Sequence, residues 1–144
     1  MDDDKALFLR AAILYYAKCL KLKTRVGDTA PIGFPLQAYF PRLSAAIEAG
    51  NFGTTSQSQR RKETLKNLLC KRHGIFLVRI TGPWEKAFED GSCRCVQMRD
   101  DTEAAMEDAV SSAFELIGQD ADVDFIRDRN AINETRKKYL IDKQ

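Results

Sequence analysis

The chain has 144 residues, of which 44% are hydrophobic and 31% charged, and its net charge is +2. This composition excludes the disordered and collagen-like classes, and the length fits one domain with its own core. No apolar run approaches the ~20 residues of a bilayer-spanning helix. Asp2, Asp3 and Asp4 are the opposite of the basic start of a secretory signal, so a cytoplasmic location is expected.

The expected domain organisation is simple. Residues 1–5, Met-Asp-Asp-Asp-Lys, resemble part of a protease-cleavage tag and are expected to be a tag remnant or disordered. Residues 6–144 are expected to form a single domain, with a core over about 6–98 and a C-terminal extension over about 99–144. The sequence shows no internal repeat with a period of about 20–50 residues.

The small net charge hides an uneven distribution. Up to Arg79 the chain has 14 Lys and Arg against 6 Asp and Glu, whereas from Ile80 onward it has 9 against 15. A basic half suits a polyanion such as nucleic acid, because phosphate neutralisation supplies most of the non-specific binding energy. The alternative is that the two oppositely charged halves pack against each other.

The four cysteines are expected to be reduced, because the sequence carries no export signal. Cys70 and His73, followed by Cys93 and Cys95, offer four ligand types that zinc accepts. Their spacing is irregular for a structural zinc site. The alternative places Cys70 on the apolar face of a helix, with Cys93 and Cys95 on one face of a strand.

The first half of the chain predicts a helix, a loop and a hairpin. Apolar side chains recur through residues 6–22 without any Gly or Pro, which indicates a largely buried helix. Residues 29–35 contain two prolines and a glycine and are expected to form a loop or an edge segment. Segments 36–40 and 43–48 are short and apolar and predict a β-hairpin, which a polar loop over 50–59 follows.

A basic helix is predicted over 60–72, with Leu65, Leu68 and Leu69 facing inward and a glycine directly after it. The run at 75–80 is continuously apolar apart from one arginine, which is typical of a central strand covered on both faces. We expect this strand to lie beside the strand that ends at Glu48, with the helices over 6–22 and 60–72 on the two faces of the sheet.

The last third predicts a strand at 93–98 and a helix that Asp100 or Asp101 caps. A short strand at 123–126 and a helix over about 128–141 complete the chain. Because strands and helices alternate, the predicted class is α/β with a single mixed sheet.

Five segments in this order carry a resemblance to a known family. They are Ala-Ile-Leu-Tyr-Tyr at 12–16, Tyr-Phe-Pro-Arg-Leu-Ser-Ala-Ala-Ile-Glu at 39–48, Arg-Lys-Glu-Thr-Leu-Lys-Asn-Leu-Leu-Cys at 61–70, His-Gly-Ile at 73–75 and Val-Asp-Phe-Ile-Arg-Asp-Arg at 123–129. The chain resembles the PD-(D/E)XK nuclease superfamily, in the branch of very-short-patch-repair-like and EDxHD homing endonucleases. This resemblance implies a restriction-endonuclease-like fold, with one mixed sheet flanked by helices.

The resemblance also implies a magnesium site, but most of the expected ligands are missing. These nucleases use several carboxylates to hold Mg²⁺ on the scissile phosphate. The acidic residue of the first helix falls at about Arg10, the aspartate before the hairpin tyrosine falls at Gln37, and the histidine falls near Thr55. Glu48 is the one expected acid that remains, so it is the metal ligand if there is any.

A relocated ligand set is the alternative. In it Glu48 and Glu63 bind Mg²⁺, Lys66 stabilises charge on the phosphate, and Gln37 offers a neutral carbonyl oxygen. These four residues are the catalytic candidates. Without metal chemistry, Glu48 is expected to form a salt bridge at a strand end, and Lys66 to lie on a solvated helix face.

The basic helix supplies the candidate nucleic-acid contacts. These are Arg60, Arg61, Lys62, Lys66, Lys71 and Arg72. At helical spacing Lys62 and Lys66 share a face, which would make a stripe for phosphates, although a solvated charged helix explains the same residues. His73 is expected to cap this helix. Phe52 and Trp84 are expected either to stack on bases or to pack inside the protein.

These observations favour a nuclease-fold domain that binds nucleic acid, duplex DNA above all, and has lost catalysis. The first alternative is an active Mg²⁺-dependent endonuclease with relocated ligands. The second is a protein-interaction or inhibitor module of a mobile element, with the acidic C-terminal half as its contact surface. No membrane partner is expected.

Overall fold

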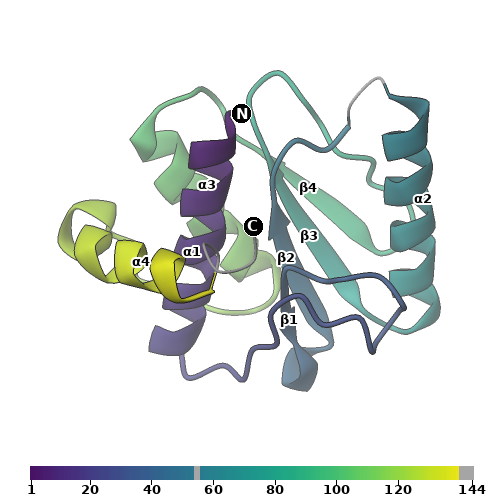
Figure 1. The fold of residues 1–144 in the computed structure, drawn as a ribbon, viewed down its shortest axis with the longest axis horizontal. Helices are drawn as coiled ribbons and strands as arrows, with labels where there is room; N and C mark the ends of the chain where they lie inside the picture. The colour runs from purple at the N-terminus through teal and green to yellow at the C-terminus, as the bar shows by residue number, and fades with distance from the viewer. Residues whose placement is uncertain (54–55, 140–144) are drawn as a thin grey trace.

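The computed structural model describes residues 1–53 and 56–139. The strands are β1 (Ala38–Phe40), β2 (Ala45–Ala49), β3 (Phe76–Thr81) and β4 (Cys93–Gln97), and a short 3-10 helix, Pro41–Leu43, joins β1 to β2. The helices are α1 (Asp3–Cys19), α2 (Gln57–Arg72), α3 (Glu103–Leu116) and α4 (Phe125–Tyr139). The strands form one sheet with helices on both faces, as Figure 1 shows, so the predicted α/β class is confirmed.

The sheet is mixed, in the order β1-β2-β3-β4. β1 and β2 pair antiparallel as the predicted hairpin, and β3 is parallel to both of its neighbours. Val78 in the middle of β3 lies between Ile47 and Arg94. The run at 75–80 therefore forms a central strand, as expected.

One face of the sheet is apolar and carries α1, α3 and α4 (Figure 1). β-Strands point alternate side chains to opposite faces, so Ile47, Val78 and Ile80 pack toward α1 and α3, while α4 packs against α1. Aromatic pairs pack within this layer. The ring centres of Phe40 and Phe114 are 6.3 Å apart, and those of Phe8 and Phe125 are 5.2 Å apart. This layer holds the larger of the two apolar clusters.

The other face carries α2 and only a small apolar cluster, near the start of the parallel strands. Its buried members are Ile32, Leu36, Ala46, Cys70, Ile75, Leu77 and Cys93. The prediction that Leu65 and Leu68 face inward is wrong, because they are 45% and 49% exposed. The buried residues of α2 are Glu63, Asn67 and Cys70. The sheet beneath α2 presents charged side chains, so α2 turns its polar residues toward them.

Capping residues determine where α2 begins and ends. The helix begins at Gln57, earlier than the predicted residue 60, because the Ser56 hydroxyl accepts a hydrogen bond from the Gln59 backbone N–H at 3.4 Å. The helix ends at Arg72 with His73 as its C-cap, as expected, and Gly74 follows with φ +69°. That left-handed conformation favours glycine and turns the chain directly into β3.

Two other boundaries differ from the sequence predictions. α1 begins at Asp3, earlier than the predicted residue 6, and the carboxylate of its N-cap Asp2 accepts the Lys5 N–H at 2.8 Å. Thr102, rather than Asp100 or Asp101, is the N-cap of α3. Within the described residues, no helix is long and apolar enough to cross a membrane.

The predicted short strand at 123–126 is wrong, because Phe125 begins α4. The Tyr16 hydroxyl accepts the Asp124 N–H at 3.0 Å and donates to the Asp128 carboxylate at 2.9 Å. The Glu107 carboxylate accepts the Phe125 N–H at 3.0 Å. The first N–H groups of a helix have no partner within the helix, and these side chains supply the acceptors. The start of a helix at Phe125 is therefore stabilised. The predicted helix end at residue 141 lies outside the described part of the chain.

Candidate functional site

Glu48 is the centre of a buried polar cluster on the α2 face of the sheet. It is the fourth residue of β2 and is 1% exposed. The Lys66 ammonium lies 2.5 Å from Oε2, and the Arg79 guanidinium Nε lies 3.4 Å from Oε1. The backbone N–H of Gln37 also donates to Oε2, at 3.2 Å. The retained acid is thus bound by two cations, and the expected salt bridge at a strand end is present.

Arg79 is the largest fully buried side chain, and the sequence prediction missed its role. Its Nη1 donates to Asn67 Oδ1 on α2 and lies 3.7 Å from the Cys93 sulfur on β4. Its guanidinium sits 4.8 Å from the centre of the Phe52 ring. The sequence did offer a signal: an arginine inside a central apolar strand cannot reach water and needs partners.

Asn67 extends this cluster to the loop between β3 and β4. Its amide donates to Asp90 Oδ1 at 2.5 Å and to the Phe88 carbonyl at 3.2 Å. A Cβ built on Gly53 would come within 2.1 Å of the Lys86 carbonyl oxygen, so this loop also presses closely on the segment after β2. The polar cluster therefore joins α2, the central strands and both loops at the carboxyl ends of the parallel strands.

Arg10 and Gln37 lie where the family resemblance implies acids. Their side chains form hydrogen bonds with the backbone of β2. The Arg10 guanidinium on α1 donates to the Ala49 carbonyl at 2.9 Å. Burial lowers the pKa of Arg10, and the negative charge of Glu48 opposes that shift. The Gln37 side-chain oxygen accepts the Ala49 N–H at 2.8 Å. The carbonyl oxygen that was expected to offer a metal ligand is therefore already used.

Glu63 is buried, but it is not paired with Glu48. Its Oε1 accepts the Gly53 N–H at 2.8 Å, which fastens the segment after β2 to α2. Its Oε2 has no hydrogen-bond partner within the described residues. Thr55, where the family histidine was expected, lies outside the residues that the structure describes. The relocated pair of Glu48 and Glu63 is thus occupied by a lysine, an arginine and a backbone amide.

The cysteine and histidine residues do not assemble into a zinc site. In residues 1–53 and 56–139, no group of three or more His, Cys, Asp or Glu side chains could hold a metal ion. Burial raises the pKa of Cys70 to about 11 and that of Cys93 to about 12, so both thiols keep their protons at neutral pH. His73 is exposed at the end of α2.

The outer surface of α2 is cationic. Its exposed basic residues are Arg60, Arg61, Lys62, Lys71 and Arg72. Lys66 does not share this surface: its side chain is 16% exposed and donates to the Pro35 carbonyl at 2.7 Å as well as to Glu48. The predicted stripe of Lys62 and Lys66 is therefore wrong. The exposed Leu65 and Leu68 lie on the same helix as the remaining cations.

The two candidate stacking aromatics have different environments. Trp84, in the loop after β3, is 79% exposed and is free to stack on a ligand. Phe52 is partly buried beneath the Arg79 guanidinium, so one face of its ring is already used.

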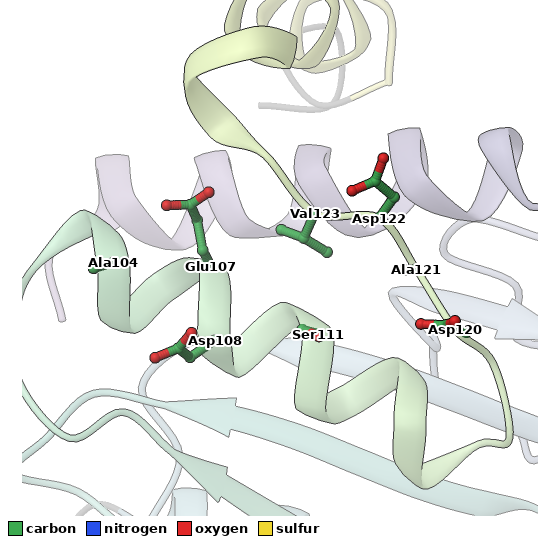
Figure 2. A pocket seen from close by; sticks show the side chains of 8 residues that line it. All are labelled: Ala104, Glu107, Asp108, Ser111, Asp120, Ala121, Asp122 and Val123. Carbon is green, nitrogen blue, oxygen red and sulfur yellow. The ribbon is translucent and has the colours of Figure 1, made fainter.

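The acidic C-terminal half forms a hollow between α3 and residues 120–123. Figure 2 shows that its carboxylates point in different directions rather than toward one point. Glu107 accepts the first N–H of α4, Asp108 pairs with Arg99, and Asp122 lies 3.0 Å from Arg127. This surface is acidic, and three of its four carboxylates have partners within the protein.

Comparisons with protein-family models, curated proteins and solved structures found no match to this chain.

Proposed function

We propose that this chain is a catalytically degenerate domain of the PD-(D/E)XK nuclease superfamily, which binds nucleic acid and does not cleave it. The observation that carries the proposal is the state of Glu48. The one acid left at an expected metal-ligand position is buried between the ammonium of Lys66 and the guanidinium of Arg79.

The order of the elements supports the restriction-endonuclease-like fold. The resembling segments at 12–16, 39–48 and 61–75 fall on α1, on the β1–β2 hairpin and on α2 with the start of β3. The segment at 123–129 falls on the first turn of α4. Glu48 ends up beside α2 at the carboxyl ends of the parallel strands, where open α/β sheets commonly place their sites.

The charge balance argues against cleavage. Mg²⁺ gives up its waters only to strong anionic ligands in octahedral geometry. To reach Glu48, the ion would have to replace an ammonium 2.5 Å away and would meet the positive charge of Arg79. Glu63 Oε1 is held by the Gly53 N–H and the Gln37 oxygen by the Ala49 N–H, and the one free oxygen of these described side chains, Glu63 Oε2, cannot form an octahedral cage alone. We expect this cluster to have no vacant anionic cage.

The outer surface of α2 supports the binding half of the proposal. Its five exposed cations form no ion pair with any described carboxylate, so their charge is available to phosphates. Contacts of this kind position a protein on a duplex without reading its sequence. The ligand is therefore duplex nucleic acid, with affinity that falls steeply as salt rises.

Two measurements test this proposal. Incubation with mixed DNA and RNA in Mg²⁺ and in Mn²⁺ is expected to give no product. Duplex binding is expected to weaken in Arg61→Glu/Lys62→Glu, with the slope of log affinity against log salt falling by about 0.9 for each phosphate that the variant no longer neutralises. Arg94→Glu/Lys137→Glu is the matched control, since it makes the same charge change at two exposed residues outside α2, and Lys137 has only an exposed pair with Glu134 in its own helix. Equal effects of the two variants would remove α2 as the interface.

Cleavage would instead support the relocated endonuclease. It would have to disappear in Glu48→Gln, Glu63→Gln and Lys66→Ala, because only a relocated site depends on all three. Bound metal should also raise the thermal midpoint, and we expect no such increase with millimolar Mg²⁺.

A protein-interaction module is the second candidate, favoured by the exposed Leu65 and Leu68 among the cations of α2. Exposed apolar side chains add little to phosphate contacts but suit an apolar partner surface. A chain with no affinity for nucleic acid at low salt would support this candidate, with the acidic half as a further contact surface.

A further inference from the structure

A groove of about 910 Å³ lies on the opposite side of the sheet from α2, between the end of α1, residues 20–26 and α4. We propose that this groove binds single-stranded nucleic acid, at a site separate from the cationic surface of α2. The proposal rests on the function above for its class of ligand, but it uses different residues. Figure 1 shows α1 and α4 on one side of the sheet and α2 on the other.

The lining of the groove is strongly cationic. Its basic residues are Lys18, Lys21, Lys23, Arg42 and Lys138. None of these five forms an ion pair with a carboxylate of the described residues. Glu134 is the one acid among the described lining residues, and its Oε1 lies 3.4 Å from the Lys137 ammonium. The groove therefore concentrates positive charge that no described side chain of the protein neutralises.

The helix dipole accounts for only part of this charge. Cations stabilise the last turn of a helix, which explains Lys18 and suits Lys21 just beyond α1. Lys23 and Arg42 lie outside the helix, and Arg42 comes from the 3-10 turn between β1 and β2. Lys21 also has φ +58°, a left-handed conformation that usually favours glycine, so a cation stands where the backbone prefers no side chain.

Aromatic and apolar side chains complete the lining. Tyr15 and Tyr139 line the groove together with Leu14, Leu22 and Val26. The Tyr15 ring packs edge-on against Tyr16 at 5.1 Å, which fixes its orientation, and the Lys138 ammonium lies 5.1 Å from the centre of the Tyr139 ring. Cations that follow a backbone and aromatic rings that stack on bases are the two parts of a single-strand site.

The size and chemistry favour a single strand over a duplex. Ligand pockets measure about 300–1,000 Å³, so this groove lies at the upper end of that range. A tyrosine within it can stack only on a base that has left its own stack, which excludes a paired helix. A polyanion without bases would use the lysines and leave the tyrosines and the apolar residues without a role.

The experiment compares three fluorescent probes: oligo(dT), an abasic oligonucleotide of the same length, and a duplex. In Lys21→Glu/Lys23→Glu we expect oligo(dT) affinity to fall by about 10-fold or more and the salt slope to flatten by about 0.7 for each phosphate that is no longer neutralised. Duplex affinity should stay unchanged. Arg42→Glu/Lys138→Glu should give the same result without touching the left-handed residue.

The tyrosines separate base binding from charge alone. Tyr139→Ala should weaken oligo(dT) binding by about 5-fold or more and leave the abasic probe unaffected. Equal loss for both probes, or unchanged oligo(dT) affinity in both groove variants, would overturn the single-strand site. The far-ultraviolet circular dichroism and thermal midpoint of each variant confirm that it is folded.

The matched control is Arg61→Glu/Lys62→Glu on α2, which carries the same charge change. It should weaken duplex binding and spare oligo(dT). If the wild type binds oligo(dT) through the groove but no duplex, the α2 interface fails and the groove stands. If oligo(dT) binding is lost only in the α2 variant, the groove is overturned and the α2 interface stands.

Discussion

The two faces of the sheet bury different kinds of side chain, although the same strands supply both. On the face of α1, α3 and α4, residues such as Ile47 and Val78 meet an apolar layer that excludes water. On the α2 face, their sequence neighbours Glu48 and Arg79 are equally buried and charged. The first face stabilises the fold through apolar burial. The second must offset the desolvation of its charges through ion pairs, which seldom give net stability.

This difference indicates what the α2 face is for. A small apolar cluster already covers the start of the strands, and packed apolar residues would have served at their ends as well. Buried charges at the carboxyl ends of parallel strands are instead typical of a site. In the proposal above they are what remains of a nuclease site after its metal ligands were replaced.

The largest expected effect comes from breaking the apolar face. Phe114 is fully buried on α3, and its ring packs near that of Phe40. Phe114→Ala should lower the free energy of unfolding by about 3–5 kcal/mol, because it removes buried area and leaves a cavity. Urea unfolding measures the change, and Leu116→Ala, on the exposed side of the same helix, is the control. Similar losses in both variants would contradict the assignment of this face as the main core.

Breaking the α2 face should have a slightly smaller effect. Glu48→Gln removes the partner of Lys66 and Arg79 and leaves a fully buried guanidinium, so we expect a loss of about 3 kcal/mol. Because the cost comes from the unpaired charge, adding Arg79→Met should recover part of it.

A double-mutant cycle of Glu48→Gln and Arg79→Met measures this coupling, which should exceed about 0.5 kcal/mol. Strict additivity would show that the two side chains do not share a network. Glu115→Gln, at an exposed position of α3, is the control for the loss of one negative charge.

Within the apolar layer, a smaller polar link is sensitive to pH. The hydrogen bonds from Arg127, together with that from Tyr16, hold the pKa of Asp128 below its usual value. A carboxyl with a lowered folded-state pKa stabilises the protein above its unfolded pKa of about 3.9, and the contribution disappears as the pH falls through the folded pKa. Asp128→Asn should therefore cost about 1 kcal/mol at neutral pH and progressively less below pH ~4.

Urea unfolding of wild type and Asp128→Asn across acidic and neutral pH tests this link. A stability difference that grows as the pH falls would reverse the sign and contradict the ion pair. Asp120→Asn, at an exposed position in the segment before α4, is the control.

The smallest effect is expected on the solvent-exposed side of α2, which faces away from the sheet. Leu65→Ser and Leu68→Ser should change the free energy of unfolding by less than about 0.5 kcal/mol, since both side chains are largely in water. Cys70→Ser, on the buried side of the same helix, provides the contrast and should be clearly destabilising. A large loss at either leucine would mean that it is covered in solution, which favours the protein-interaction candidate.

Local sequence patterns were enough to predict most of the fold. The apolar run at 75–80, the hairpin before Glu48 and the helical spacing after Asp101 each depend on neighbours in the chain, and each prediction was close to the structure. The salt bridge of Glu48 could also be foreseen, because a lone buried carboxylate needs a cation. The nuclease resemblance and the nucleic-acid function remain predictions.

The errors came from interactions between distant residues. Leucines usually face inward, but on the inner side of α2 Asn67 lies toward the sheet, because it accepts a hydrogen bond from the buried Arg79. The local hydrophobicity of the helix does not reveal this partner. The segment at 123–126 has strand-forming residues, but Tyr16, more than a hundred positions earlier, supplies the hydrogen bonds of a helix start. Such pairs become visible only when the tertiary structure brings them together.

The packing of α1 against α4 determines when the domain can be completed during synthesis. Phe125 on α4 covers the rings of Phe8 and Tyr16, and α4 is the last described element to leave the ribosome. Until then, the first helix exposes aromatic surface that its own neighbours in the chain cannot bury. Long-range contacts of this kind slow folding and prolong the time during which partly folded, aggregation-prone chains are exposed. We therefore expect nascent chains that lack α4 to be bound by chaperones.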